Sequence, residues 1–117
     1  LAGKFDGLSV RVPTPVVSLS DVTALLRRDA TVEQVNGAFK KAAQSNFYQG
    51  ILGVSEEPLV SRDFIGNSCS GIVDLPLTKV VDGNLIKVMV WYDNEWGYSN
   101  RLVELVADVG HYLRRSE

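Results

Sequence analysis

Hydrophobic and polar residues alternate near the start of the chain in a way that predicts strands. The leucine and valines at positions 8, 10 and 12 are separated by Ser9 and Arg11, which is the two-residue period of a half-buried strand. Pro13 and Pro15 end this strand, because proline lacks an amide donor and has a fixed backbone angle. Residues 16–26 are β-branched and apolar at first and then leucine-rich, and they predict a second strand.

An amphipathic helix is predicted to follow Thr31. Thr31 and Gln34 have the spacing of a capping box, in which a threonine hydroxyl and a glutamine side chain satisfy free amides at a helix start. The apolar residues of this segment then fall on one helical face: Val32, Val35, Phe39, Ala42 and Ala43. We expect the helix to end near Asn46.

Several strand-like runs come next. They cover residues 51–55, 60–64, 71–74, 77–81 and 85–92. Asp82, Gly83 and Asn84 separate the last two runs, and Asp-Gly in that position indicates a hairpin. Pro76 interrupts the strand before the hairpin, which indicates a sheet edge or a bulge there.

The chain closes with a second predicted helix. Its apolar stripe comprises Leu102, Leu105, Val106, Val109, Tyr112 and Leu113. Consecutive strands joined by short turns, together with two helices, predict an α+β fold. We expect a largely antiparallel or mixed sheet with helices on one face and a closing C-terminal helix.

Composition and charge narrow the classes of function. The chain has 117 residues, enough for one domain, with 12 basic and 14 acidic residues and a net charge of −2. This balance offers no electrostatic footprint for nucleic acid or an anionic membrane. No segment has the length of a membrane span or the layout of a signal peptide, and the single cysteine fits a reducing compartment. We therefore expect a cytoplasmic protein.

The chain opens on Leu1, not Met, and soon enters a patterned segment. This start indicates a piece cut from a longer protein, because a natural amino terminus usually begins more loosely. A processed but complete small protein is the alternative.

Arg11 is the first candidate for ligand binding. It lies among apolar residues just before a Pro-Thr-Pro corner. A guanidinium in such a place either pairs with a carboxylate or faces an anion, since an unpaired buried charge is costly. Its planar fork suits phosphate oxygens. The residues alone leave both interpretations open.

A second group of candidates lies between residues 85–92 and the closing helix. Asn94 offers a donor and an acceptor together, which suits pairing with another carboxamide. The alternative is that Asp93 and Asn94 only cap the helix, and that Tyr98 only packs near its start. Ser18, Ser20 and Asp21 look solvated and do not resemble a metal site, so no metal ligands are predicted.

Two motifs carry a family resemblance that extends over essentially the whole chain. The stretch WYDNEWGYSNR at residues 91–101 resembles a signature of the phosphorylating glyceraldehyde-3-phosphate dehydrogenases, and VRVPTP at residues 10–15 resembles a second one. The resemblance implies that residues 1–117 are the C-terminal part of the catalytic domain, without the N-terminal NAD-binding domain. The parent enzyme would oxidise and phosphorylate glyceraldehyde 3-phosphate to 1,3-bisphosphoglycerate with NAD and inorganic phosphate. NADP is the alternative cofactor.

The resemblance also implies roles for three residues. Arg11 matches the family's arginine that binds the phosphate of the substrate or inorganic phosphate. Asn94 matches the asparagine that holds the nicotinamide carboxamide, and Tyr98 the tyrosine beside the nicotinamide ring. Glu95 and Trp96 are expected to be structural. The chain departs from many relatives at Val16, where they carry asparagine, which puts an additional polar contact there in doubt.

No catalytic residue is predicted within this chain. The family's nucleophilic cysteine lies in a Ser-Cys-Thr-Thr-Asn stretch, and the residues around Cys69 do not match it. Cys69 is expected to be a small, partly buried thiol. His111 lies late in the closing helix with no reacting group nearby, and the family's catalytic histidine precedes the region present here. The isolated chain is therefore expected to be inactive.

The resemblance bears on assembly as well. Family members are homotetramers, and their final helix packs on the N-terminal domain. Without that domain, the closing helix is expected either to fold onto its own sheet or to dock on another copy of the chain. Two alternatives to the lead function remain: a related sugar-phosphate dehydrogenase acting on erythrose 4-phosphate, and a non-catalytic assembly or interaction module.

Overall fold

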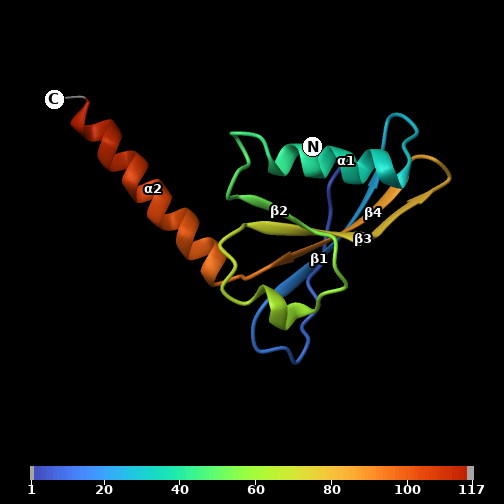
Figure 1. The fold of residues 1–117 in the computed structure, drawn as a ribbon, viewed down its shortest axis with the longest axis horizontal. Coiled ribbons are helices and arrows are strands. Elements are labelled where there is room, and N and C mark those ends of the chain that lie inside the picture. The colour runs from blue at the N-terminus through green and yellow to red at the C-terminus, as the bar shows by residue number, and fades with distance from the viewer. Residues whose placement is uncertain (1, 116–117) are drawn as a thin grey trace.

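A computed structural model describes residues 2–115 of the chain, and within them a mixed sheet is accompanied by two α-helices (Figure 1). In chain order the elements are β1 (Ser18–Leu25), α1 (Val32–Ala43), β2 (Leu52–Ser55), the 3-10 helix η1 (Ser61–Phe64), β3 (Gly71–Val81), β4 (Leu85–Tyr92) and α2 (Trp96–Arg114). None of the helices in this part of the chain combines the length and apolarity needed to cross a bilayer.

The four strands lie in the order β1-β4-β3-β2. β4 pairs antiparallel with both β1 and β3, whereas β2 pairs parallel with β3. The predicted α+β class with a mixed sheet and a closing helix is therefore confirmed. The register of β1 and β4 sets Ser18 opposite Tyr92, so the start of β1 and the end of β4 share one edge of the sheet.

The hairpin between β3 and β4 forms where it was predicted. Asp82 and Gly83 have positive φ angles of 52° and 79°, which suit a tight turn. The two runs 71–74 and 77–81 form one strand, and its pairing with β4 is irregular between Asp74 and Lys79. Pro76 lies in this irregular stretch, as its missing amide donor led us to expect.

α1 covers one face of the sheet (Figure 1). The capping box is present: the Gln34 amide donates to Thr31 Oγ1 at 3.2 Å, and the Thr31 amide donates to Gln34 Oε1 at 2.9 Å. The helix ends at Ala43, slightly earlier than expected. Its Val35 packs against a buried cluster formed by Val73, Leu75 and Val88.

A second buried cluster joins η1 to the sheet. It contains Val17, Phe64 and Ile72, with Cys69 and Trp91 packed against it. The Phe64 and Trp91 rings are stacked, with centroids 5.5 Å apart. Since Trp91 and its neighbour Val90 point to opposite sides of β4, this cluster lies on the face that α1 leaves uncovered.

Two of the predicted strands are wrong. Residues 8–12 form no strand and are exposed, with Leu8 at 85% of its full exposure. Apolar and polar side chains do alternate in this segment, but no strand within the described residues pairs with it. The run 60–64 instead contains η1 (Ser61–Phe64), because Asp63 Oδ2 accepts the Val60 amide at 2.8 Å and closes a tight turn.

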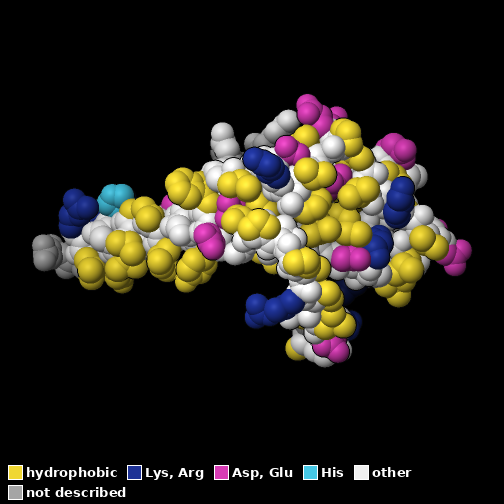
Figure 2. All heavy atoms as spheres, turned by 90° about the horizontal axis from the view of Figure 1, so that it is seen from below, with side chains coloured by type: hydrophobic (Ala, Val, Ile, Leu, Met, Phe, Trp, Pro, Cys, Tyr) yellow, Lys and Arg dark blue, Asp and Glu magenta, His cyan; other side chains and the backbone are white. Residues whose placement is uncertain are grey.

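α2 begins at Trp96, earlier than the predicted apolar run, and extends away from the sheet (Figure 1). Every residue of its predicted stripe is exposed, and hydrophobic side chains gather along the projecting helix (Figure 2). The expectation that this helix folds onto its own sheet is therefore wrong.

Candidate functional site

The three candidate binding residues belong to two segments that meet one edge of the sheet. Arg11 precedes β1, whereas Asn94 and Tyr98 follow β4. Because Ser18 and Tyr92 are register partners, the chain enters β1 beside the place where it leaves β4. Antiparallel pairing thus places the entry to β1 beside the exit from β4, whereas no hydrogen bond or ion pair joins Arg11 to Asn94 or Tyr98 among the described residues.

Asp93 fixes the turn that carries Asn94. Its carboxylate is buried, with 4% exposure, and accepts three backbone N–H groups. Oδ1 accepts from Glu95 at 3.0 Å and from Trp96 at 2.9 Å, and Oδ2 accepts from Gly66 at 2.9 Å. These bonds, led by those from Trp96 and Gly66, lower the pKa of Asp93 below its ordinary value. One side chain therefore caps α2 and ties it to the turn after η1.

Asn94 does not cap the helix, although the sequence left that interpretation open. Its side chain is exposed, and its Oδ1 accepts a hydrogen bond from the Ser18 hydroxyl at 3.4 Å. Among residues 2–115, Asn94 Nδ2 has no hydrogen-bond partner. Asp93 therefore caps the start of α2, and the N–H donor of the Asn94 side chain bonds to no other group in the described residues.

Arg11 is exposed and forms no ion pair within the described residues. The structural ion pair considered for it does not form in this part of the chain. The segment turns where the Thr14 amide donates to the Val12 carbonyl at 2.8 Å. It then enters β1 through Val17, a buried β-branched residue with a φ of 71°. Such a backbone is strained and is maintained here by the packing of Val17.

Tyr98 is 68% exposed on the first turn of α2, and Trp96 beside it is 54% exposed. Neither ring packs into the cores of the described structure. A surface recess of about 460 Å³ lies elsewhere, and its lining contains none of the three candidates. It is formed by Val54, Ser55, Glu56, Glu57, Leu59, Asp63, Phe64, Asn67 and Ile72.

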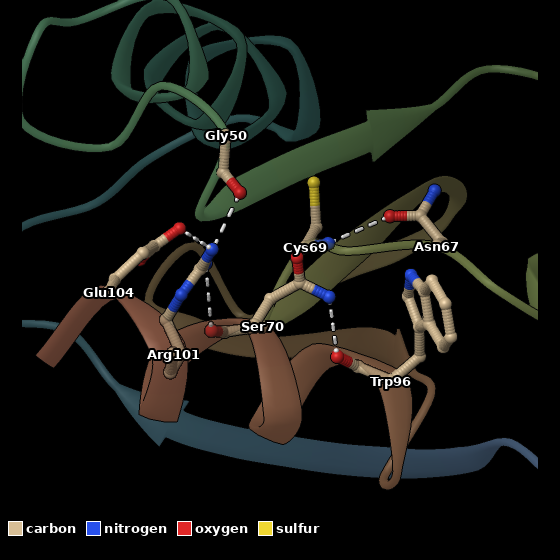
Figure 3. A network of polar contacts seen from close by, with 8 residues as sticks. Gly50, Asn67, Cys69, Ser70, Trp96, Arg101 and Glu104 are labelled. Atoms are coloured by element: carbon tan, nitrogen blue, oxygen red, sulfur yellow. Dashed lines mark hydrogen bonds and ion pairs between the residues drawn. The ribbon is translucent and has the colours of Figure 1, made fainter. Parts of the chain in front are cut away.

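Arg101 holds the first part of α2 against the rest of the molecule (Figure 3). Its Nη1 donates to the Gly50 carbonyl at 3.2 Å and to Ser70 Oγ at 3.4 Å. Its Nη2 pairs with Glu104, one helical turn later. We did not single out Arg101 from the sequence, although an arginine three residues before a glutamate on a helix was a visible signal.

Gly97 allows α2 to lie close to the chain before β3. A Cβ at this buried position would lie 2.8 Å from the Cys69 carbonyl oxygen, well inside contact distance. Figure 3 shows Cys69 and Ser70 beside this end of the helix. The glycine of the DNEWGYSN stretch therefore serves close packing between two backbones.

Other residues considered from the sequence include Cys69, His111, Ser18 and Asp21. Cys69 is half-buried, and burial raises the pKa of its thiol against a smaller opposite effect of Arg101. Its partial burial agrees with the small, partly buried thiol that the sequence predicted. His111 is exposed near the end of α2. Asp21, taken to be solvated, pairs with Lys87 at 2.8 Å, and Ser18 contacts Asn94.

Comparisons with known proteins agree on one family. Residues 1–94 match the sequence model described as glyceraldehyde 3-phosphate dehydrogenase, C-terminal domain. A glyceraldehyde-3-phosphate dehydrogenase of Zymomonas mobilis is 50% identical over 113 residues, which are 97% of this chain and 34% of that protein. Those of Geobacillus stearothermophilus and Bacillus subtilis are 52% and 53% identical over 107 residues, which are 92% of this chain and 32% of each relative. The chain thus spans about a third of the length of these curated relatives.

Gly97→Ala is expected to destabilise the protein by about 1–3 kcal/mol, because the added methyl group forces α2 away from Cys69. Gly110→Ala is the matched control on the same helix. A Cβ there meets nothing within 4 Å, so this change should stabilise the helix by about 0.5–1 kcal/mol. Urea denaturation followed by circular dichroism measures both, and equal effects of the two changes would contradict the close packing.

Asp93→Asn is expected to cost about 2–3 kcal/mol at neutral pH. The charge is lost, and an amide donor can face the Gly66 N–H. Because the folded-state pKa of Asp93 is lowered, its contribution is complete above the unfolded pKa of about 4 and is lost as pH falls through the folded value. The stability gap between wild type and variant should be constant from about pH 5 to 7 and narrow below about pH 4.

Urea titrations at several pH values test this expectation, with Asp108→Asn as the charge-matched control on an exposed face of α2. A gap that stays the same down to the lowest accessible pH would show that the Asp93 charge is not what stabilises the turn.

Proposed function

Because this chain belongs to the family of glyceraldehyde-3-phosphate dehydrogenase C-terminal domains, we propose that it is the C-terminal part of the catalytic domain of an NAD-dependent phosphorylating dehydrogenase. The enzyme oxidises glyceraldehyde 3-phosphate and phosphorylates the product to 1,3-bisphosphoglycerate in cytoplasmic glycolysis. The chain alone carries binding groups without a nucleophile, so it is inactive by itself.

The observation that carries the proposal is the unused N–H donor of the Asn94 amide. Its Nδ2 has no hydrogen-bond partner among residues 2–115, while Asp93 performs the capping that the turn requires. A donor held at a strand end and not used by the protein suits the carboxamide of a nicotinamide ring. NAD would supply the hydride acceptor for oxidation of the aldehyde. Asn94 and Tyr98 would orient and flank its ring, and NADP is the alternative cofactor.

The exposed guanidinium of Arg11 supports the phosphate side of the proposal. It has no carboxylate partner in the described part of the chain, so its five donors are available to an anion. A phosphate group can accept two parallel hydrogen bonds from it. Arg11 would therefore bind the phosphate of glyceraldehyde 3-phosphate or the inorganic phosphate that becomes the acyl phosphate.

The exposed stripe of α2 supports a larger assembly. It consists of Leu102, Leu105, Val106, Val109, Tyr112 and Leu113. An apolar helix face of this length is normally covered. We propose that the remainder of the enzyme covers it, and that the complete enzyme is a homotetramer.

Arg11→Ala in the full-length enzyme is expected to raise the KM for inorganic phosphate or for glyceraldehyde 3-phosphate about tenfold or more. The reason is the loss of charge-assisted hydrogen bonds of about 1.5–3 kcal/mol. The Kd for NAD should stay within about twofold of wild type. Steady-state kinetics and cofactor titration measure these constants. Arg28→Ala, which removes an exposed arginine beyond the other end of β1, is the control. Unchanged KM values for both phosphate ligands would remove Arg11 from the site.

Asn94→Ala in the same enzyme is expected to slow hydride transfer about tenfold and to weaken NAD binding, because the ring loses its orienting donor. Asn94→Asp keeps the shape but not the N–H donor, so it should show a similar loss. Single-turnover formation of NADH reports the hydride step directly. Wild-type rates in both variants would exclude Asn94 as a cofactor contact.

A further inference from the structure

Ser18 makes the one hydrogen bond that reaches the Asn94 carboxamide within residues 2–115. Ser18 is the first residue of β1 and lies opposite Tyr92, the last residue of β4. Its hydroxyl donates to Asn94 Oδ1 at 3.4 Å, although the two residues are 76 positions apart in sequence. The contact is therefore a product of the β1–β4 register.

In the structure this bond occupies the oxygen end of the amide. An unrestrained asparagine side chain rotates about its last bond and presents either its oxygen or its nitrogen to a ligand. With Oδ1 occupied by the Ser18 hydroxyl, the nitrogen end remains available. The backbone on both sides is already fixed, because Asp93 accepts the amides of Glu95 and Trp96.

We propose that Ser18 is a positioning residue for the cofactor. Its hydroxyl holds Asn94 with Nδ2 directed outward, so that Nδ2 donates to the carbonyl oxygen of the nicotinamide carboxamide. This inference rests on the proposed function and adds a residue to it. Ser18 acts through Asn94 and does not itself contact the reacting atoms.

The neighbouring serine offers a matched control. Ser20 lies two residues further along β1 on the same side of the strand, opposite Val90, and makes no hydrogen bond to Asn94. Replacing either serine by alanine removes the same hydroxyl from the same strand. Only the change at Ser18 should affect the Asn94 amide.

A first experiment examines the hydrogen bond in the 117-residue chain itself, without any cofactor. Nitrogen-15 relaxation of the Asn94 side-chain NH₂, assigned by its disappearance in Asn94→Ala, reports how far the amide is restrained. We expect similar order parameters in wild type, Ser18→Thr and Ser20→Ala, and a clear decrease in Ser18→Ala. An unchanged order parameter in Ser18→Ala would overturn the proposal.

A second experiment measures function in the full-length dehydrogenase that contains this segment. The 3.4 Å separation is long for an O–H···O bond, so we expect a modest effect: Ser18→Ala should raise the Kd for NAD and slow hydride transfer about two- to fivefold. Ser18→Thr keeps a hydroxyl and should restore most of this loss. The KM for inorganic phosphate should not change, because that ligand is assigned to Arg11.

A double-mutant cycle separates positioning from general stability. In an Asn94→Ala background, Ser18→Ala should add no further loss, since the group that it orients is gone. An equal loss in both backgrounds would overturn the proposal in favour of a purely structural serine. If Asn94→Ala itself left NAD binding and hydride transfer at wild-type values, the proposed function would fail and this inference with it. If Asn94→Ala were impaired and Ser18→Ala were not, only the inference would fail.

Discussion

The buried carboxylate of Asp93 is the interaction on which the geometry of this chain depends. Burying a carboxylate is costly unless donors replace water, and here three backbone N–H groups do so. Two of these donors open α2 and the third comes from Gly66 after η1, so a single side chain joins three parts of the fold. Capping by Asp93 also explains why the Asn94 side chain is exposed, because the start of α2 needs no second cap.

The direction of α2 is set by its first two turns. Asp93 holds the start, Gly97 permits contact with the Cys69 backbone, and Arg101 reaches Gly50 and Ser70. Beyond these contacts the helix leaves the sheet (Figure 1). Such an arrangement presents an apolar stripe away from the domain, which would be unfavourable for a helix whose partner was its own sheet. Anchoring at one end and exposure along the rest agree with the proposal that the remainder of the enzyme covers this helix.

Much of the fold could be predicted from the sequence where the determinants are local. The capping box at Thr31, the Asp-Gly hairpin and the alternation in residues 85–92 all specified structure through neighbouring residues, and each is confirmed. Residues 8–12 failed because alternation predicts a strand only when a partner strand is present, and none of the described strands pairs with them. Asp63 turned residues 60–64 into η1 through one side-chain bond, which periodicity does not detect. The Ser18–Asn94 and Asp93–Gly66 contacts depend on strand register and on packing between distant segments. No local sequence pattern predicts such contacts.

The two binding roles proposed here demand different precision in the placement of the binding group. A phosphate is attracted by a charge and tolerates some variation in its approach, which an exposed arginine in an irregular segment can satisfy. Hydride transfer requires the nicotinamide ring at a defined distance and angle, so its orienting group must be fixed beforehand. Under the proposed role, Asn94 would be held in advance by two contacts: Asp93 accepts the amide of the next residue, Glu95, and the Ser18 hydroxyl donates to the Asn94 amide oxygen. Ser18 reaches Asn94 through the β1–β4 register. A shift of that pairing by one residue would turn Ser18 to the opposite face and leave Asn94 unrestrained.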